Sequence, residues 1–258
     1  MKSKYTSVLP VLPKRKYFKI GDTGNEVKLV QAFINWANNG TIRKKLKLDG
    51  DYGKLTAQAV SFFEEVHGLK QDGEFGKKCR KLAAKLVMDD AWMAVNWAVS
   101  IAKNNSFAYG TGDRAHHNGC YFCGTNITGP KKAKKGSRWE KTYCCNPFIH
   151  AAYAHGAGVP KMLRDCKRAN AAGMNPSDWT KYGFIKVGKC KNVKFADLKH
   201  GDVIIRSSHV FMYVGGNRFV EATSSGGFGA DSIIHKKGMK SRYREYQKVS
   251  SAYVMRFK

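Results

Sequence analysis

Apolar residues recur at helical spacing in three stretches of the first 90 residues. The second and third stretches each follow a turn-forming Asp-Gly pair, and Asn25 stands where it can cap the first. The apolar positions are Val27, Val30, Ile34 and Ala37, then Leu55, Ala59, Phe62, Phe63 and Val66, and then Cys79, Leu82, Ala83 and Leu86. This spacing places them on one face of each helix. We expect three short helices packed in a small bundle.

The two turns between these helices are copies of one motif. Residues 49–54 read DGDYGK, and residues 72–77 read DGEFGK. Glycine tolerates the positive φ that a tight turn needs, and each copy places an aromatic residue between the turn and the helix. The repeat predicts that the second and third helices begin in the same way.

The pattern changes near residue 90. Residues 91–99 and the stretch from Phe148 to Tyr153 have helical spacing, and the Gly- and Lys-rich residues 104–142 between them predict an inserted loop. Short β-rich runs then alternate with turns, at residues 201–205, 209–214, 218–222 and 252–256. Helices followed by strands predict an α+β domain with an antiparallel sheet.

The chain is strongly basic. Its 258 residues include 46 Lys and Arg against 19 Asp and Glu, a formal net charge of +27. This balance favours a polyanionic partner, which can be nucleic acid, an anionic membrane surface or a wall with phosphate polymers; the alternative is that the charge only keeps the protein soluble. No apolar run is long enough for a membrane span, and the start lacks the apolar core of a secretory signal. We therefore expect neither a transmembrane segment nor a signal peptide.

A cysteine, a histidine and a glutamate stand in an order typical of nucleophilic catalysis. Cys144 and Cys145 stand at the start of a predicted helix, where unpaired N–H groups and the helix dipole favour a thiolate. His209 opens one β-rich run, and Glu221 lies in the next. If the two runs pair through a turn at 215–217, the carboxylate can orient the imidazole as a base. The alternatives are a packed cysteine, an exposed histidine and a surface ion pair.

A second group of reactive side chains lies in the inserted loop. Cys120 and Cys123 form a Cys-x-x-Cys pair, and His116 precedes it. With a fourth ligand from Cys144, Cys166 or Cys190, they can bind a structural Zn²⁺ tetrahedrally and order the loop. Free thiols or a redox pair are the alternatives. We expect catalysis to need no cofactor.

Residues 17–87, which follow a tail at 1–16, resemble the peptidoglycan-binding domain found at the ends of many cell-wall hydrolases. The resemblance rests on residues 19–24 (KIGDTG), on Val27, Val30, Gln31 and Ile34, on the two turn copies, and on residues 59–62 (AVSF). A basic loop at 38–45 is longer than the family pattern needs. The resemblance implies that peptidoglycan is a partner, and the positive charge would add anionic wall polymers.

Residues 92–258 resemble the NlpC-type cysteine peptidases, papain-like α+β enzymes that cut peptide bonds in bacterial cell walls and are related to CHAP-type hydrolases. The resemblance rests on residues 107–110 (FAYG), 144–149 (CCNPFI) with Tyr153, 197–203 (DLKHGDV) and 209–222 (HVFMYVGGNRFVEA). It implies Cys145 as the nucleophile, His209 as the base, Glu221 as the orienting residue and Tyr109 beside the nucleophile. The family usually has Asp before the nucleophile and Ser after it, so the adjacent Cys144 stays the alternative nucleophile.

Together the two resemblances imply an endolysin-like peptidoglycan hydrolase that cleaves an amide bond in the stem peptide. We expect a phage lysin, made in the bacterial cytoplasm without a signal peptide and acting at the wall after release; a delivered antibacterial toxin or a tail component is the alternative. A second hypothesis is a basic wall-polymer or nucleic-acid binding protein with a catalytically dead hydrolase fold, and a third is an acyltransferase. No RNP, KH or finger motif supports specific nucleic-acid binding.

Overall fold

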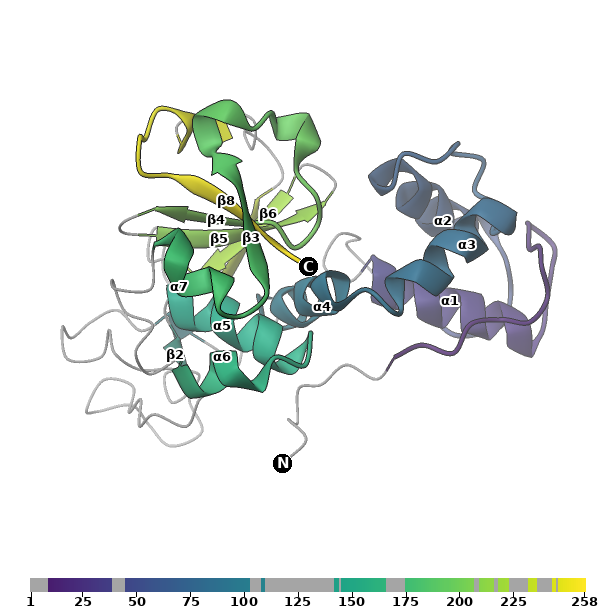
Figure 1. The fold of residues 1–258 in the computed structure, drawn as a ribbon. Coiled ribbons are helices and arrows are strands. Elements are labelled where there is room, and N and C mark those ends of the chain that lie inside the picture. The colour runs from purple at the N-terminus through teal and green to yellow at the C-terminus, as the bar shows by residue number, and fades with distance from the viewer. Residues whose placement is uncertain are drawn as a thin grey trace. The chain divides into compact units, whose positions relative to one another are not determined.

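The computed structural model describes residues 9–38, 45–102, 108–109, 142–143, 145–165, 175–206, 209–215, 218–222, 232–235, 243–244 and 246–258. The chain divides into two compact units (Figure 1). We call Ser7–Asp89 the helical unit and Asp90–Lys258 the sheet unit. Within the described ranges, no helix is long and apolar enough to cross a membrane.

The helical unit contains three helices that share an aromatic core. They are α1 (Asn25–Ala37), α2 (Lys54–Val66) and α3 (Lys77–Leu86). The ring of Phe33 on α1 contacts Phe63 on α2 and Phe75 just before α3, with centroids 5.5 and 5.7 Å apart. All three rings are fully buried. The second turn copy therefore contributes its aromatic residue to the centre of the unit.

The predicted cap of the first helix is wrong. Asn25 is the first residue of α1 itself, and the N-cap is Gly24, with φ 109° and no side-chain cap hydrogen bond. The carboxylate of Glu26 accepts hydrogen bonds from the backbone N–H groups of Lys14 and Arg15 instead, at 2.6 and 3.1 Å. The start of α1 thus anchors the segment that precedes the helices.

The predicted buried face of the second helix is also partly wrong. Leu55 is 72% exposed, while Thr56 and Glu64 are buried on α2. Both polar residues hold the repeated turns: Thr56 Oγ1 bonds to the first turn, and the Glu64 carboxylate accepts the N–H of Gly73 in the second at 2.8 Å. Because these bonds fix the rotation of α2, Leu55 faces solvent.

The sheet unit contains one six-stranded sheet, one two-stranded sheet and four helices in the part of the chain that the structure describes. The helices are α4 (Asp90–Ala102), α5 (Cys145–His155), α6 (Pro160–Asp165) and α7 (Pro176–Thr180), with short 3₁₀ turns at Cys190–Asn192 and Phe195–Asp197. The strands are β1 (Ala108–Tyr109), β2 (Thr142–Tyr143), β3 (Phe184–Lys189), β4 (Val203–Arg206), β5 (His209–Gly215), β6 (Arg218–Ala222), β7 (Ser232–His235) and β8 (Tyr253–Phe257).

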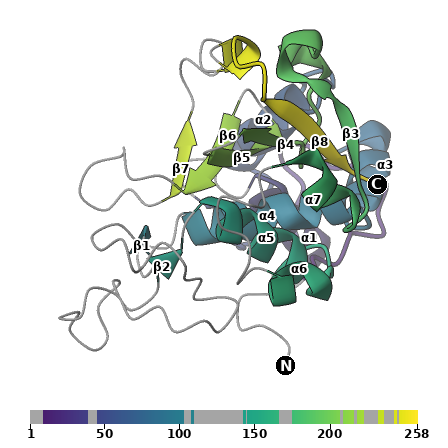
Figure 2. The ribbon, with the colours of Figure 1, turned by 60° about the vertical axis from the view of Figure 1, so that its left-hand side comes forward.

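The large sheet has the strand order β3-β8-β4-β5-β6-β7, and every neighbouring pair is antiparallel (Figure 2). The predicted α+β class and antiparallel sheet are confirmed. β1 and β2 pair separately, in parallel.

Helices α4 and α5 pack against each other and against the middle of the sheet. Both contact β5 and β6, and α4 also contacts β7. A second apolar cluster includes Phe211 and Tyr213 of β5, Phe219 of β6 and Val254 of β8, with Tyr243 packed among them. β5 is therefore buried from Val210 to Val214, and only its ends can reach a ligand.

Candidate functional site

The first residue of α5 is Cys145, a half-buried free thiol. The helix behind it is held by fully buried apolar side chains, among them Phe148, Ile149 and Tyr153. A thiol at a helix N-terminus lies beside unpaired N–H groups and the positive end of the helix dipole, and both stabilise a negative sulfur. Packing thus fixes the helix, while Cys145 at its start stays partly exposed.

His209 and Glu221 face each other across the hairpin formed by β5 and β6. The register pairs Met212 with Val220, which sets Glu221 opposite Phe211, two residues from His209 on the same side of β5. The His209 Nε2 and Glu221 Oε2 atoms lie 2.6 Å apart. The histidine side chain is 14% exposed and the glutamate side chain 1%. The carboxylate is thus a buried and direct partner of the imidazole.

The electrostatics of His209 tie this pair to Cys145. Burial lowers the pKa of His209, but side-chain hydrogen bonds to Cys145 and Glu221, together with the negative charges of both groups, raise that pKa to about 9. The imidazole is therefore protonated at neutral pH. Three side chains that are far apart in the sequence converge on one point.

Tyr109 is placed near this point by its backbone. It belongs to β1, where it pairs with Tyr143 of β2, and Tyr143 stands two residues before Cys145. The two strands therefore bring residue 109 alongside the segment that leads into α5.

The predicted zinc ligands lie outside the described residues. His116, Cys120 and Cys123 belong to the range 110–141, and the alternative nucleophile Cys144 is likewise not described. Within the ranges that are described, no group of three or more His, Cys, Asp or Glu side chains could hold a metal ion. The structural zinc site stays a prediction.

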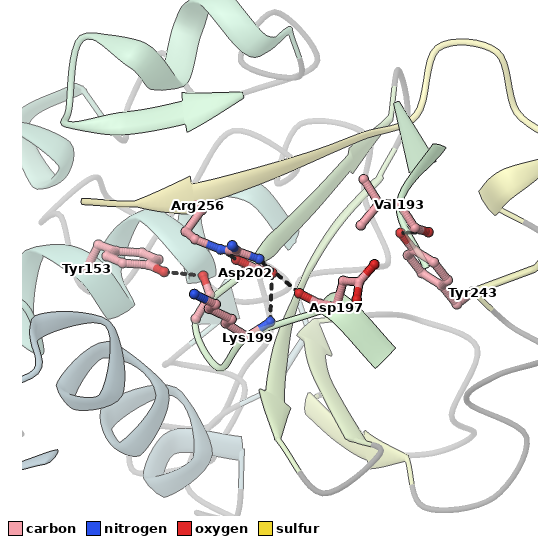
Figure 3. A network of polar contacts seen from close by, with 8 residues as sticks. Tyr153, Val193, Asp197, Lys199, Asp202, Tyr243 and Arg256 are labelled. Atoms are coloured by element: carbon pink, nitrogen blue, oxygen red, sulfur yellow. Dashed lines mark hydrogen bonds and ion pairs between the residues drawn. The ribbon is translucent and has the colours of Figure 1, made fainter. Parts of the chain in front are cut away.

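An ion pair between Arg256 of β8 and the buried Asp202 lies in a network of polar contacts (Figure 3). Both Asp202 oxygens accept hydrogen bonds from the guanidinium of Arg256 at 2.7 Å, and Asp202 Oδ2 also accepts the N–H of Lys199 at 2.8 Å. The Asp202 side chain has no exposed surface. This network joins β8 to the turn that leads into β4.

The same turn is tied to α5. The hydroxyl of Tyr153, on α5, donates to the carbonyl of Gly201. Gly201 has φ +79°, and a Cβ built there would lie 2.7 Å from that of Ala91 and 3.0 Å from the Tyr153 hydroxyl. Only glycine fits this close approach of helix and turn. The bonds fix α5 relative to the strands that carry His209 and Glu221.

Arg206 is a functional candidate that the sequence pattern did not single out. It ends β4 directly opposite His209 in the strand register, and its guanidinium lies 5.2 Å from the centre of the Tyr246 ring. Its Nε atom is buried without a hydrogen-bond partner among the residues described. A cation at the strand position opposite His209 can attract an anionic group of a substrate.

The helical unit carries a groove beside the first turn copy, which we call the turn groove. Its volume is about 790 Å³. It is lined by Gln31, Lys45, Leu46, Lys47, Asp49, Asp51, Gly53, Lys54, Leu55, Thr56, Gln58, Ala59 and Phe62. Gln31 binds the turn with both ends of its amide, donating to Asp49 at 2.8 Å and accepting from the N–H of Gly50 at 3.0 Å. Charges of both signs, amides and an exposed leucine suit a glycan with attached peptides.

Residues 23–82 match the family model described as "Putative peptidoglycan binding domain". No curated protein and no solved structure matches the chain. The match covers both turn copies and all of α1 and α2. The chain thus carries a peptidoglycan-binding domain in its helical unit, which associates it with the bacterial cell wall.

Proposed function

We propose that the chain is a peptidoglycan hydrolase in which Cys145 attacks an amide bond of the wall peptide. The observation that carries this proposal is the convergence of Cys145, His209 and Glu221, with 2.6 Å between imidazole and carboxylate. A nucleophile, a base and a residue that orients the base are the parts that acyl transfer through a cysteine requires.

The first half of the reaction forms an acyl-enzyme. The Cys145 thiolate adds to the amide carbon, and the carbonyl electron pair moves onto oxygen. The N–H groups at the start of α5 face the developing oxyanion, and the position of β1 supports a part for Tyr109 beside them. When the tetrahedral intermediate collapses, the C–N bond breaks and protonated His209 gives its proton to the leaving amine.

The second half releases the acid. Neutral His209 removes a proton from water, the hydroxide adds to the thioester, and the C–S bond breaks to return the Cys145 thiolate and protonated His209. Glu221 holds Nε2 of the ring throughout, which leaves Nδ1 for exchange with the sulfur and the water. Because the carboxylate is buried, the imidazole cannot easily rotate away to solvent.

The peptidoglycan-binding domain would keep the enzyme on its insoluble substrate. Tethering raises the local concentration of cleavable bonds without any new contact at the catalytic site. Within this proposal the enzyme acts at the wall, after release by a phage or after delivery into a competitor, and its substrate is the stem peptide.

The test compares Cys145→Ala with Cys144→Ala on purified, insoluble peptidoglycan. New amino groups released by cleavage are measured together with the turbidity of the suspension. We expect Cys145→Ala to lose at least about 10³-fold in rate and Cys144→Ala to retain activity. The opposite result would move the nucleophile by one residue.

The same experiment tests the second hypothesis, in which the protein binds the wall but does not hydrolyse it. If the unaltered chain binds the insoluble wall but releases no amino groups from any peptidoglycan chemotype, the three residues form no working site. Mass spectrometry of the fragments identifies the bond when cleavage does occur.

A further inference from the structure

The helical unit has a second groove, distinct from the turn groove, along one side of α3. We call it the α3 groove; its volume is about 560 Å³. Its floor is apolar, formed by Leu12, Pro13, Phe75, Ala83 and Ala84. Its remaining lining residues are Lys16, Lys77, Arg80 and Lys81.

Every charged residue that lines the α3 groove is a cation. By contrast, the turn groove also contains Asp49 and Asp51. Within the ranges described by the structure, none of the four cations of the α3 groove forms an ion pair. An apolar groove with four cations and no internal counter-charge has a strongly positive potential.

The stability of α3 does not explain why these positions carry positive charge. The N-terminal end of a helix favours acidic side chains, but the first turn of α3 has none and instead carries Lys77 and Lys78. Lys77 and Lys81 stand one turn apart, about 6 Å along the axis, on the same side as Arg80. The helix therefore presents a row of positive charge at some cost to its own stability, as expected for a binding surface.

We propose that the α3 groove binds a phosphodiester polymer of the glycerol-phosphate type, an anionic component of bacterial walls that differs from the peptidoglycan glycan. Lysines bind phosphates as point charges, and arginine can bind two phosphate oxygens at once. Leu12 and Ala84, the two residues of the floor that are not buried, can contact the carbon atoms between successive phosphates. This site is independent of the proposed hydrolysis, because it lies within the helical unit.

The composition of the groove favours this ligand over single-stranded nucleic acid. Proteins that bind such strands stack the bases on exposed aromatic rings. The one aromatic residue that lines the α3 groove, Phe75, is fully buried against Phe33. The groove thus offers charge and aliphatic surface, but no ring for a base.

The experiment measures binding of the full chain to a fluorescently labelled poly(glycerol phosphate) of defined length. A groove variant, Lys77→Gln with Arg80→Gln and Lys81→Gln, is compared with a control variant, Lys28→Gln with Lys78→Gln and Lys85→Gln. Both lose three positive charges from exposed or half-exposed sites of the same unit, but the control positions do not line the groove. Thermal unfolding confirms that both variants are folded. Lys16→Gln, from a different segment, serves as an independent single variant.

We expect the groove variant to bind the polymer about tenfold more weakly and the control variant about twofold more weakly, with a shallower salt dependence for the groove variant. Lys16→Gln should lose about twofold to threefold. Equal losses in the two triple variants, or no binding by the unaltered chain, would overturn the proposal. So would tighter binding of a single-stranded DNA of equal charge that is lost in the groove variant, which would identify a nucleic-acid site.

Discussion

Two arginine–aspartate ion pairs with nearly equal N–O distances show how differently the two units use charge. Arg256 and Asp202 in the sheet unit are 2.7 Å apart, and Arg15 and Asp22 in the helical unit are 2.6 Å apart. The Arg256 and Asp202 side chains are 24% and 0% exposed, whereas those of Arg15 and Asp22 are 47% and 17% exposed. The N–O distance alone therefore says little about how much either pair contributes to the free energy of unfolding.

The difference extends to the chemistry of the two units. His209 and Glu221 form a second buried pair in the sheet unit, where low exposure strengthens each interaction and makes its loss costly. The cations of the α3 groove lie at the surface, where each contact is weak and several must add up. Function in the sheet unit should therefore fail on a single substitution, while function in the helical unit should decline in small steps.

The largest effect in this comparison should come from Glu221→Gln. The substitution keeps the shape of the side chain but removes the charge that stabilises protonated His209. We expect the rate of peptidoglycan cleavage to fall by about 10²- to 10⁴-fold, with little change in binding to the wall. The control is Asp90→Asn, which neutralises an exposed acid at the start of α4 and should keep nearly full activity.

The same substitution should change the pH dependence. The His209 pKa is raised from 6.5 to about 9 in the folded protein, so the stability gained from the protonated ring is complete below about 6.5 and is lost as pH rises through about 9. Activity that needs the protonated ring should decline over the same alkaline range. In Glu221→Gln the alkaline limb of the pH–rate profile should move to lower pH. An unmoved limb would show that Glu221 does not act through the histidine.

A smaller effect, on stability rather than rate, should separate the two arginine pairs. Arg256→Ala leaves Asp202 buried with only the Lys199 N–H and its local backbone bonds, and should destabilise folding by about 3 kcal/mol. Arg15→Ala exposes Asp22 to water and should cost no more than about 1 kcal/mol. Denaturant unfolding of both variants measures the difference. Equal losses would mean that burial does not distinguish the pairs.

The spacing of apolar residues was sufficient to predict the strands that are buried on both faces of the sheet. The runs at 209–214 and 218–222 lie in the middle of the sheet, and the structure has β5 and β6 there. The two edge strands were missed. β3 exposes Ile185 and Val187 and contains lysines, and β7 has only two apolar residues, Ile233 and Ile234, so neither gives the longer apolar pattern of an internal strand.

The candidate site could be predicted to the extent that local geometry fixes it. A hairpin relates His209 to Glu221 within a few residues, and a predicted helix start marks the adjacent Cys144 and Cys145, between which the family resemblance favours Cys145. The Asp202–Arg256 pair joins residues 54 positions apart, and no turn or helix period relates them. Such long-range polar contacts depend on how the strands are ordered, which the pattern along one strand does not contain.

The buried face of α2 also depends on polar contacts that the apolar spacing does not show, and it gives the smallest predicted effect. Helical spacing grouped Leu55 with the core, but buried hydrogen bonds of Thr56 and Glu64 rotate the helix so that Leu55 lies 72% exposed in the lining of the turn groove. Leu55→Gln should therefore change the free energy of unfolding by less than about 0.5 kcal/mol. Because an exposed leucine gains by partial burial against a ligand, binding to purified peptidoglycan should weaken by about threefold.

The matched control is Met88→Gln, which replaces another apolar residue of the helical unit that is 82% exposed and does not line the turn groove. Its binding to peptidoglycan should be unchanged. Co-sedimentation with the insoluble wall, measured with Cys145→Ala as the background to prevent cleavage, gives both values. Equal weakening in the two variants would show that general apolar surface, rather than the turn groove, holds the polymer. A loss of about 2 kcal/mol in the free energy of unfolding for Leu55→Gln would instead indicate that Leu55 is buried in the core, as the apolar spacing predicted.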